Sequence, residues 1–495
     1  MADIELASLF RFDNTYVELP ERFYARQDPA AVAAPLLIRL NRDLAGVLGL
    51  DADALDGALG AQVFSGNLVP PGAAPLAMAY AGHQFGNFVP QLGDGRAILL
   101  GEVVGRDGVR RDLQLKGAGR TKFSRGGDGR AALGPVLREY ILSEAMAALG
   151  IPTTRALAAV TTGENVFREE ELPGAIFTRV AQSHVRIGTF AYFASRGDAE
   201  GVRLLADYVI ARHYPEAGGA ENPYRALLEG VIGRTATLVA RWLLVGFIHG
   251  VMNTDNMSVA GETIDYGPCA FMDSFHPDTV YSSIDHMGRY AYGNQPQIAY
   301  WNLARLAEAL LPVLGADQES AVAEARAALD TYPGLFEAAY HAGMRRKLGF
   351  FEAREEDMVL ARALLSAMAA GEADFTLTFR RLSGMAESGD AGKVRALFAD
   401  AAAFDEWQGR WVARLEAEGG LSVARAAAMR AVNPRFIPRN HWVQAAITAG
   451  MAGDFSVFET LLEVLARPFE DQPEFAAYEA PPLPHEVVLH TFCGT

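Results

Sequence analysis

A run of oxygen-bearing side chains near the middle of the chain is suited to binding a divalent metal ion. His249 is followed seven residues later by Asn256, and an Asp-x-Gly tripeptide begins at Asp265. Mg²⁺ usually takes one or two oxygen ligands from the protein and the rest from water and phosphate groups. The pattern therefore predicts a metal site made by Asn256 and Asp265 that would also hold the phosphates of a nucleotide.

Protein kinases have the same order of residues, with an asparagine seven positions after the loop histidine and then an Asp-x-Gly. They also place a catalytic aspartate two positions after the histidine, where this chain has Val251. Asp255 is the only carboxylate in the loop 249–256 and is the candidate to accept a proton from an attacking hydroxyl. Its alternative role is to brace the loop by accepting backbone N–H groups. The chain thus keeps the metal-binding groups of a kinase without the usual base.

A glycine-rich turn and a lysine predict a phosphate-binding surface earlier in the chain. Gly93, Gly95 and Arg96 precede a strand expected at 97–104, and the next expected strand, 112–116, ends in Lys116. Glycines let backbone N–H groups approach phosphate oxygens, and kinases close their third strand with a lysine. An ordinary hairpin turn and a solvated lysine are the alternatives to this interpretation.

The segment 117–130 strengthens the phosphate interpretation because it holds five glycines and four basic side chains. From Arg96 to Arg130 there are nine basic and four acidic residues, a local charge of +5 in a chain of net charge −16. A basic patch in an acidic protein indicates an anionic ligand. A mobile surface loop would explain the charge but not the density of glycines.

A phosphate-binding lysine of this kind needs a carboxylate to orient it. A helix is predicted with Pro135 in its first turn and Gly150 at its end. Glu139 and Glu144 both have apolar neighbours at helical spacing, so each would need a buried partner. Glu139 is the first candidate to pair with Lys116, and periodicity leaves Glu144 open as a rival.

The bulk composition is that of a soluble protein, with 50% apolar and 21% charged residues. The net charge of −16 argues against a nucleic-acid partner, because phosphate backbones are bound by basic surfaces. The first residues, 1–5, show neither a signal peptide nor a transit peptide, and the longest apolar stretch, 238–248, is too short to span a bilayer. Two cysteines suit a reducing compartment. We therefore expect a cytoplasmic protein without a membrane or nucleic-acid partner.

The patterning along the chain predicts an α+β fold of two lobes facing each other across a cleft. A further strand is expected at 175–180, and helices are expected at 234–248, 302–314, 319–329 and 358–370. Two short strands, 257–260 and 263–265, are expected to form a hairpin that brings Asn256 close to Asp265. The predicted divisions are an N-terminal extension (1–75), a strand-containing N-lobe with the glycine-rich loops (76–190), a C-lobe with the catalytic and metal loops (191–300), and a helical extension (301–495).

Several longer motifs resemble the selenoprotein O family of protein adenylyltransferases, which are kinase-fold proteins long regarded as pseudokinases. The resemblance covers most of the chain. The matching segments are Tyr80–Gly86, Gln91–Arg96, Leu115–Thr121, His249–Asn256, Ile264–Pro268, Asn433-Pro434 and Arg439–His441.

The resemblance implies a two-lobed kinase-like fold and transfer of AMP from ATP to Ser, Thr or Tyr hydroxyls of protein substrates, with Mg²⁺ or Mn²⁺. It implies that ATP is turned end for end relative to kinases, so that pyrophosphate leaves. By this resemblance, Lys116 would contact the phosphates and Glu139 would orient it, while Gly93, Gly95 and Arg96 would form the glycine loop. Asp128 and Gly129 would make further contacts with the nucleotide, and Arg179 and Arg186 would bind its terminal phosphates. Asn256 and Asp265 would bind the metal ion, and Asp255 would act as the base.

Two other reaction classes stay open on the sequence alone. A phosphotransferase could use Asp255 as a relocated base, and Val251 is compatible with a nucleotide-binding scaffold that has no turnover. The family resemblance also draws attention to Cys493, because members often carry a cysteine or selenocysteine near the C-terminus. Its only partner for a disulfide would be Cys269, for which a small buried side chain is an equally good interpretation.

Overall fold

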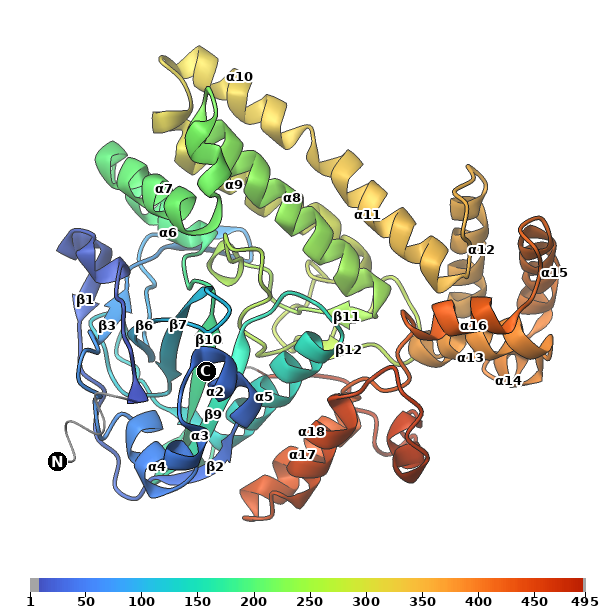
Figure 1. The fold of residues 1–495 in the computed structure, drawn as a ribbon, viewed down its shortest axis with the longest axis horizontal. Helices are drawn as coiled ribbons and strands as arrows, with labels where there is room; N and C mark the ends of the chain where they lie inside the picture. The colour runs from blue at the N-terminus through green and yellow to red at the C-terminus, as the bar shows by residue number, and fades with distance from the viewer. Residues whose placement is uncertain (1–8, 493–495) are drawn as a thin grey trace.

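The computed structural model describes residues 9–492 and combines a sheet-rich N-terminal region with a helical C-terminal region (Figure 1). All strands but two of the described part lie between Tyr24 and Ala181. The strands are β1 (Tyr24–Arg26), β2 (Leu36–Leu40), β3 (Leu76–Met78), β4 (Gly82–Gln84), β5 (Asn87–Val89), β6 (Ala97–Val104), β7 (Arg110–Lys116), β8 (Ala131–Ala132), β9 (Arg155–Phe167), β10 (Glu171–Ala181), β11 (Phe247–Ile248) and β12 (Ala270–Phe271).

The helices become longer and more closely spaced after β10. The α-helices are α2 (Arg42–Leu48), α3 (Ala52–Leu55), α4 (Ala58–Phe64), α5 (Leu133–Ala148), α6 (Ile187–Ala194), α7 (Ala199–His213), α8 (Pro223–Leu244), α9 (Gln295–Leu314), α10 (Gln318–Leu329), α11 (Tyr332–Lys347), α12 (Asp357–Ala370), α13 (Phe375–Ser388), α14 (Gly392–Arg395), α15 (Ala402–Glu416), α16 (Val423–Arg430), α17 (Asn440–Met451) and α18 (Ser456–Leu465). Short 3₁₀ helices occur at Tyr16–Glu18, Glu21–Phe23, Pro215–Gly219, Thr254–Asn256, Tyr292–Asn294 and Pro473–Glu479.

The main sheet has eight strands in the order β1-β3-β6-β7-β10-β9-β2, with β8 paired to β10. Neighbouring strands β6, β7, β10 and β9 are antiparallel. Strand β6 is buried along nearly its whole length, which fits its apolar sequence. The three strands expected here all form, and β7 and β10 extend beyond the predicted bounds.

Helix α5 lies on the sheet and is itself covered by the last two helices of the chain (Figure 1). It ends as predicted at Gly150, which has a left-handed φ of 74°, and Ile151 N–H bonds back to Met146 O at 3.0 Å. Apolar side chains of α5, α17 and α18 form one core cluster with β9 and β10. Helices far along the sequence thus support the helix that carries Glu139.

The remaining helices build the larger part of the molecule. Helix α8 packs against α9, α10 and α11, and α12–α16 form a group beyond the end of α11 (Figure 1). The predicted helices at 302–314, 319–329 and 358–370 correspond to α9, α10 and α12, and α9 starts seven residues earlier than expected. None of the helices between residues 9 and 492 combines the length and apolar character needed to cross a bilayer.

Helix α8 differs from its prediction at both ends. It starts at Pro223 rather than Arg234, because Asn222 caps it by accepting the Arg225 N–H. It ends at Leu244, and Gly246 turns the chain with a φ of 74°. Residues 247–248, expected to be helical, pair as β11 with β12 instead.

The predicted hairpin between Asn256 and Asp265 does not form. Its two halves find partners outside the segment: Ser258 pairs with Arg186, and Thr263 pairs with Thr153. Pairing with the chain ahead of α6 and ahead of β9 replaces the local ladder, so residues 257–265 form a turn held between other elements. The expectation failed because the strand-like pattern is compatible with non-local pairing as well as with a hairpin.

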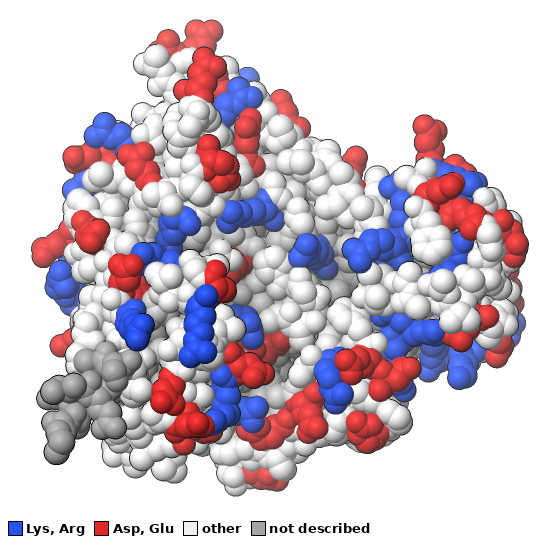
Figure 2. Space-filling model, viewed as in Figure 1, with Lys and Arg blue, Asp and Glu red and all other residues white. Residues whose placement is uncertain are grey.

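Charge is distributed over the surface rather than collected in one place on the face that Figure 2 shows. Acidic and basic side chains alternate there, and several Lys and Arg side chains cross the middle of the view. The net charge of −16 is therefore not expressed as a single acidic patch on this face.

The packing of α18 on α5 can be tested at Phe458, which is fully buried and lies 5.4 Å from the Tyr140 ring, centroid to centroid. We expect Phe458→Ala to cost about 3–5 kcal/mol locally. That change would speed amide exchange in α17, α18 and the adjoining face of α5 by roughly a hundredfold or more. Hydrogen–deuterium exchange measures it. Phe492→Ala is the control, because this ring is 68% exposed, and unchanged exchange in α17 for Phe458→Ala would contradict the assigned packing.

Candidate active site

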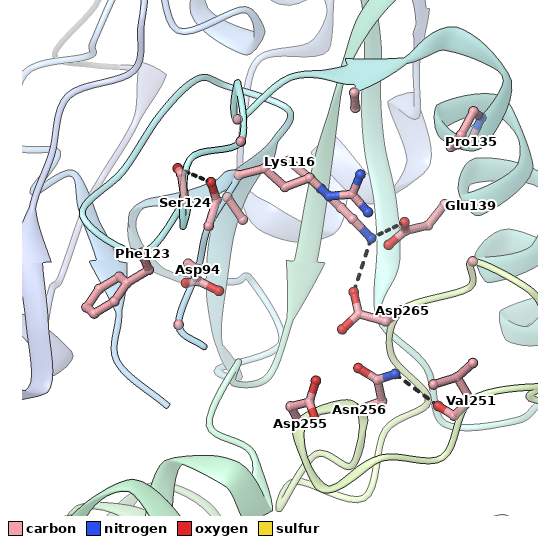
Figure 3. Close-up of a pocket in the computed structure, with 18 of the residues that line it drawn as sticks. Asp94, Lys116, Phe123, Ser124, Pro135, Glu139, Val251, Asp255, Asn256 and Asp265 are labelled. Carbon is pink, nitrogen blue, oxygen red and sulfur yellow. Dashed lines mark hydrogen bonds and ion pairs between the residues drawn. The ribbon is translucent and has the colours of Figure 1, made fainter. Parts of the chain in front are cut away.

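A cavity of about 790 Å³ opens between the sheet with its glycine-rich loops and the loops that follow α8 (Figure 3). All the residues that the sequence analysis assigned to nucleotide, metal or catalysis line it. They are Gly93, Gly95, Arg96, Lys116, Asp128, Gly129, Glu139, Arg179, Arg186, Asp255, Asn256 and Asp265. The fold thus gathers residues that lie between positions 93 and 265 of the sequence around one space.

The centre of the cavity is a cluster in which three cations contact one carboxylate. Lys116 Nζ lies 2.5 Å from Glu139 Oε2 and 3.1 Å from Asp265 Oδ1 (Figure 3). Arg179 and Arg186 contact the two Asp265 oxygens at 2.5 and 2.7 Å. Burial alone would raise the pKa of Asp265, but the charges of Arg179, Lys116 and Arg186 hold it well below its ordinary value.

Strand register explains why Arg179 belongs to this cluster. Arg179 of β10 is the direct partner of Gln114 on β7, so both side chains lie on the same face as Lys116. Gln114 Oε1 accepts hydrogen bonds from Arg179 Nε at 3.1 Å and from its Nη2 at 2.6 Å. Arg179 is only 1% exposed. Its sequence neighbourhood gives no sign of this burial, which depends on the pairing of two distant strands.

Arg186 is held from several sides, which fixes its guanidinium over the cavity. Its Nη1 donates to the Asp255 backbone carbonyl and to the Asp265 carboxylate, both at 2.7 Å. The guanidinium lies 4.6 Å from the centre of the Tyr80 ring, and Asp94 is 3.8 Å away. Burial raises the pKa of Asp94. Two cavity residues that the sequence analysis did not choose, Tyr80 and Asp94, therefore help to position a chosen one.

The choice between the two glutamates of α5 is resolved by their contacts. Glu139 faces Lys116, whereas Glu144 bonds Arg155 at 2.7 Å and accepts the Ala156 N–H at 2.8 Å. Glu144 also accepts from Asn41. It lies outside the cavity and joins α5 to β9.

The two glycine-rich loops interlock above Lys116. Gly93 has a φ of 75°, and a Cβ there would lie 2.3 Å from the Phe123 ring. Gly129 has a φ of 71°, and a Cβ there would overlap the Gly119 backbone at 2.1 Å. Glycine is therefore required at both positions. The close approach of the loops leaves their backbone lining the cavity.

Asp128 lies at the outer edge of the same loop. Its carboxylate pairs with Arg168 at 2.8 Å, and this pair lowers the pKa of Asp128. The Arg130 N–H donates to Asp128 at 2.9 Å. In this arrangement the carboxylate anchors the loop, and both Asp128 and Arg168 line the cavity.

The metal-ligand candidates lie side by side across the cavity floor. The Asn256 Nδ2 donates to the Val251 carbonyl at 2.9 Å, and its oxygen lies on the side of Asp265 in Figure 3. Asp265 adopts a left-handed φ of 63°, which is uncommon for a residue other than glycine and occurs at functional sites. No group of three or more His, Cys, Asp or Glu suited to a metal occurs within residues 9–492. The amide and carboxylate oxygens fit Mg²⁺ or Mn²⁺ only together with phosphate oxygens and water.

Asp255, the candidate base, is a buried carboxylate with a raised pKa. Its Oδ1 is buried and has no hydrogen-bond partner among the described residues. Burial raises the pKa of this carboxyl to about 6. Gly82 packs directly against it, since a Cβ at that position would lie 2.2 Å from Oδ1. The β4–β5 hairpin therefore covers Oδ1, while Asp255 still lines the cavity.

That hairpin is the part of the site that the residue-by-residue sequence reasoning missed. The His83 N–H donates to Thr254 Oγ1 at 2.7 Å, and the Phe85 N–H donates to Asn253 Oδ1 at 2.9 Å. Both acceptors belong to the catalytic loop. The sequence feature that could have indicated this hairpin is the motif Tyr80–Gly86, which resembles the family but to which the sequence analysis assigned no catalytic side chain.

Cys269 does not line the cavity. Cys269 is a fully buried thiol, and burial raises its pKa to about 12. Cys493 lies outside the described residues.

Comparison with known proteins identifies the family. The sequence model of the family described as "Protein adenylyltransferase SelO" matches residues 7–466. Proteins named protein nucleotidyltransferase YdiU are similar along their whole length. A relative from Rhodopseudomonas palustris is 65% identical over 488 residues, which is 98% of this chain and 99% of the relative. A relative from Methylorubrum extorquens is 65% identical over 499 residues, 99% of this chain and 100% of the relative. The resemblance seen in the motifs is confirmed, and the chain belongs to the SelO family of protein adenylyltransferases.

Proposed function

We propose that this chain transfers AMP from ATP to Ser, Thr or Tyr hydroxyls of other proteins and releases pyrophosphate. The fold is proposed to be kinase-like, with the sheet and glycine loops of 76–190 facing the catalytic and metal loops of 191–300. Residues 1–75 and 301–495 are proposed as extensions of that core. Membership of the SelO family makes adenylyl transfer the activity of the chain.

The observation that carries the proposal is the convergence of Lys116, Arg179 and Arg186 on Asp265. A phosphate-binding lysine alone is the kinase arrangement. Two additional buried guanidiniums at the same point provide the positive charge that a leaving pyrophosphate needs as the bond to it breaks. This favours an inverted ATP with its β- and γ-phosphates at the cations and its α-phosphate toward Asp255.

In the proposed reaction the hydroxyl oxygen of the protein substrate attacks the α-phosphorus. The bond between that phosphorus and the bridging oxygen breaks, and pyrophosphate leaves with both bonding electrons. Asp255, which lines the cavity, accepts the hydroxyl proton. Lys116, Arg179 and Arg186 hold the leaving group, and Glu139 keeps the lysine in place.

Asn256 and Asp265 are proposed to hold Mg²⁺ or Mn²⁺. The metal would neutralise charge on the phosphate oxygens. Gly93, Gly95, Arg96, Asp128 and Gly129 are proposed to surround the rest of the nucleotide, since they line the same cavity.

Parallel incubation with α-labelled and γ-labelled ATP plus Mg²⁺, followed by denaturing electrophoresis of a mixture of unfolded proteins, tests the reaction. We expect label to be retained from the α position only, and to disappear when the metal is chelated. Retention from the γ position would indicate a phosphotransferase with Asp255 as a relocated base. Nucleotide binding with no label from either position would indicate a scaffold.

The base assignment predicts a loss of turnover without loss of nucleotide. We expect Asp255→Asn to lower the rate of transfer by about 10²–10⁴-fold while the Kd of ATP changes little, because a base acts in the transition state. Calorimetric titration gives the Kd, and α-label transfer gives the rate. Asp278→Asn removes an 85% exposed carboxylate and is the matched control. A variant Asp255→Asn that transfers at the normal rate would contradict the assignment.

The two glutamates of α5 give a matched pair of variants. We expect Glu139→Gln to lower kcat/KM roughly 10²-fold, because Lys116 loses the charge that orients it. Glu144→Gln removes the same charge from the same helix but touches only Arg155, Asn41 and Ala156. Its transfer rate should stay near that of the wild type. Equal losses in the two variants would show that the helix, and not the lysine contact, is responsible.

A further inference from the structure

A second cavity, of about 580 Å³, lies beside the active site. It is formed by the hairpin β4–β5, the loop that follows β12 and the first half of α9. Most of its surface is apolar, with one guanidinium at its edge. The residues that matter here are Phe85, Ile284, Met287, Arg289, Ile298 and Trp301.

The two cavities are adjacent and share part of their lining. Phe85 and Ile284 line both of them. Their shared wall is fixed to the catalytic loop, because Asn253 Oδ1 accepts the Phe85 N–H at 2.9 Å and the Tyr290 hydroxyl at 2.6 Å. Asn253 is two residues before Asp255. A polypeptide whose acceptor residue lies in the active-site cavity would therefore place neighbouring residues beside the second cavity.

The rim of the second cavity exposes apolar side chains. Met287 is 92% exposed and Ile284 is 52% exposed. The ring of Phe85 is only partly covered, by Tyr290 at 5.1 Å between ring centroids. Apolar side chains grouped around a hollow next to an active site are typical of a binding site for another molecule.

The cavity also offers a positive charge. The Arg289 guanidinium lies 5.0 Å from the centre of the Trp301 ring and forms no ion pair with a carboxylate among residues 9–492. Its buried Nε has no hydrogen-bond partner in that range. Asp285 is the acidic residue nearby, and its two carboxylate oxygens accept the backbone N–H groups of Arg289 and Tyr290 at 2.9 and 2.7 Å. The free charge that a ligand meets at this edge is therefore that of Arg289.

We propose that this cavity binds the polypeptide substrate, taking a large apolar side chain against Met287 and Trp301 and an Asp or Glu carboxylate at Arg289, both close in sequence to the acceptor hydroxyl. The inference rests on the proposed function and specifies its substrate class. The occupant is a polypeptide because the apolar side chains and the cation line a cavity that shares Phe85 and Ile284 with the active-site cavity. The residues that flank an acceptor hydroxyl would lie next to them. The site recognises residues that flank the acceptor and does not contact the reacting atoms.

The test uses the full-length chain and an oriented peptide library in which one Ser, Thr or Tyr acceptor has degenerate flanking positions. Transfer is followed with α-labelled ATP, and binding of the same peptides is measured separately on an array with a non-hydrolysable ATP analogue. We expect selection of Asp or Glu at one flanking position and of a large apolar residue at another. A library without flanking preference in both measurements would overturn the proposal.

Charge reversal identifies the residue responsible. We expect Arg289→Glu to prefer Lys or Arg at the position where the wild type prefers Asp or Glu. The ratio of kcat/KM between acidic and basic peptides should change by about tenfold or more. A merely misfolded variant cannot gain a new preference. Met287→Ser should raise the KM of the selected peptide several-fold and leave its kcat near that of the wild type. Arg410→Glu and Met451→Ser, exposed residues on α15 and α17, are the controls.

The outcomes separate this proposal from the proposed function. Array binding that switches with Arg289→Glu, in the absence of any transfer of α-label, would keep the docking site and reject adenylyl transfer. Transfer of α-label whose flanking preference is the same in the wild type and in Arg289→Glu would keep the activity and overturn the docking site.

Discussion

The site depends on a single buried carboxylate that three cations share. Asp265 meets Lys116 from β7, Arg179 from β10 and Arg186 from the segment before α6. Burying any one of these cations without a counter-charge would be costly. The Asp265 carboxylate therefore supplies the counter-charge for cations from three elements of the N-terminal region, and it does so from the opposite side of the cavity. The sheet, the glycine-rich loops and the segment that carries Asp265 are positioned relative to each other through this contact.

Support for the cluster comes from far along the chain. Arg138, beside Glu139 on α5, donates to the Gly267 carbonyl at 3.1 Å and to Asn440 Oδ1 at 3.0 Å. One side chain thus connects the lysine-orienting helix, the Asp-x-Gly turn and the start of α17. The contact ties Asn440 to the Asp-x-Gly turn, which lies more than 170 residues earlier in the sequence. The helical extension contributes to the geometry of the site as well as to the bulk of the fold.

The spacing of residues along the sequence predicted those parts of the protein whose structure depends on neighbours in the sequence. Lys116, Asn256 and Asp265 could be chosen from motif spacing, and the strand 97–104 from its apolar run, because neighbours in sequence determine them. Arg179 could be assigned only by family resemblance, since its burial depends on its register opposite Gln114. The hairpin at 257–265 failed for the same reason, as Ser258 and Thr263 pair with distant segments. Periodicity could not separate Glu139 from Glu144, which differ in the partners that other elements bring to them.

The cation cluster has a thermodynamic consequence for nucleotide binding. Cations exposed to water attract mobile salt ions, and an anionic ligand gains entropy by releasing them. Here Asp265 already serves as a fixed, internal counter-ion for Lys116, Arg179 and Arg186. A triphosphate that binds these cations therefore meets a tethered carboxylate, and fewer dissolved anions are released than from cations exposed to water. Salt should therefore weaken ATP binding less than it would in a cleft whose cations are paired only with dissolved anions.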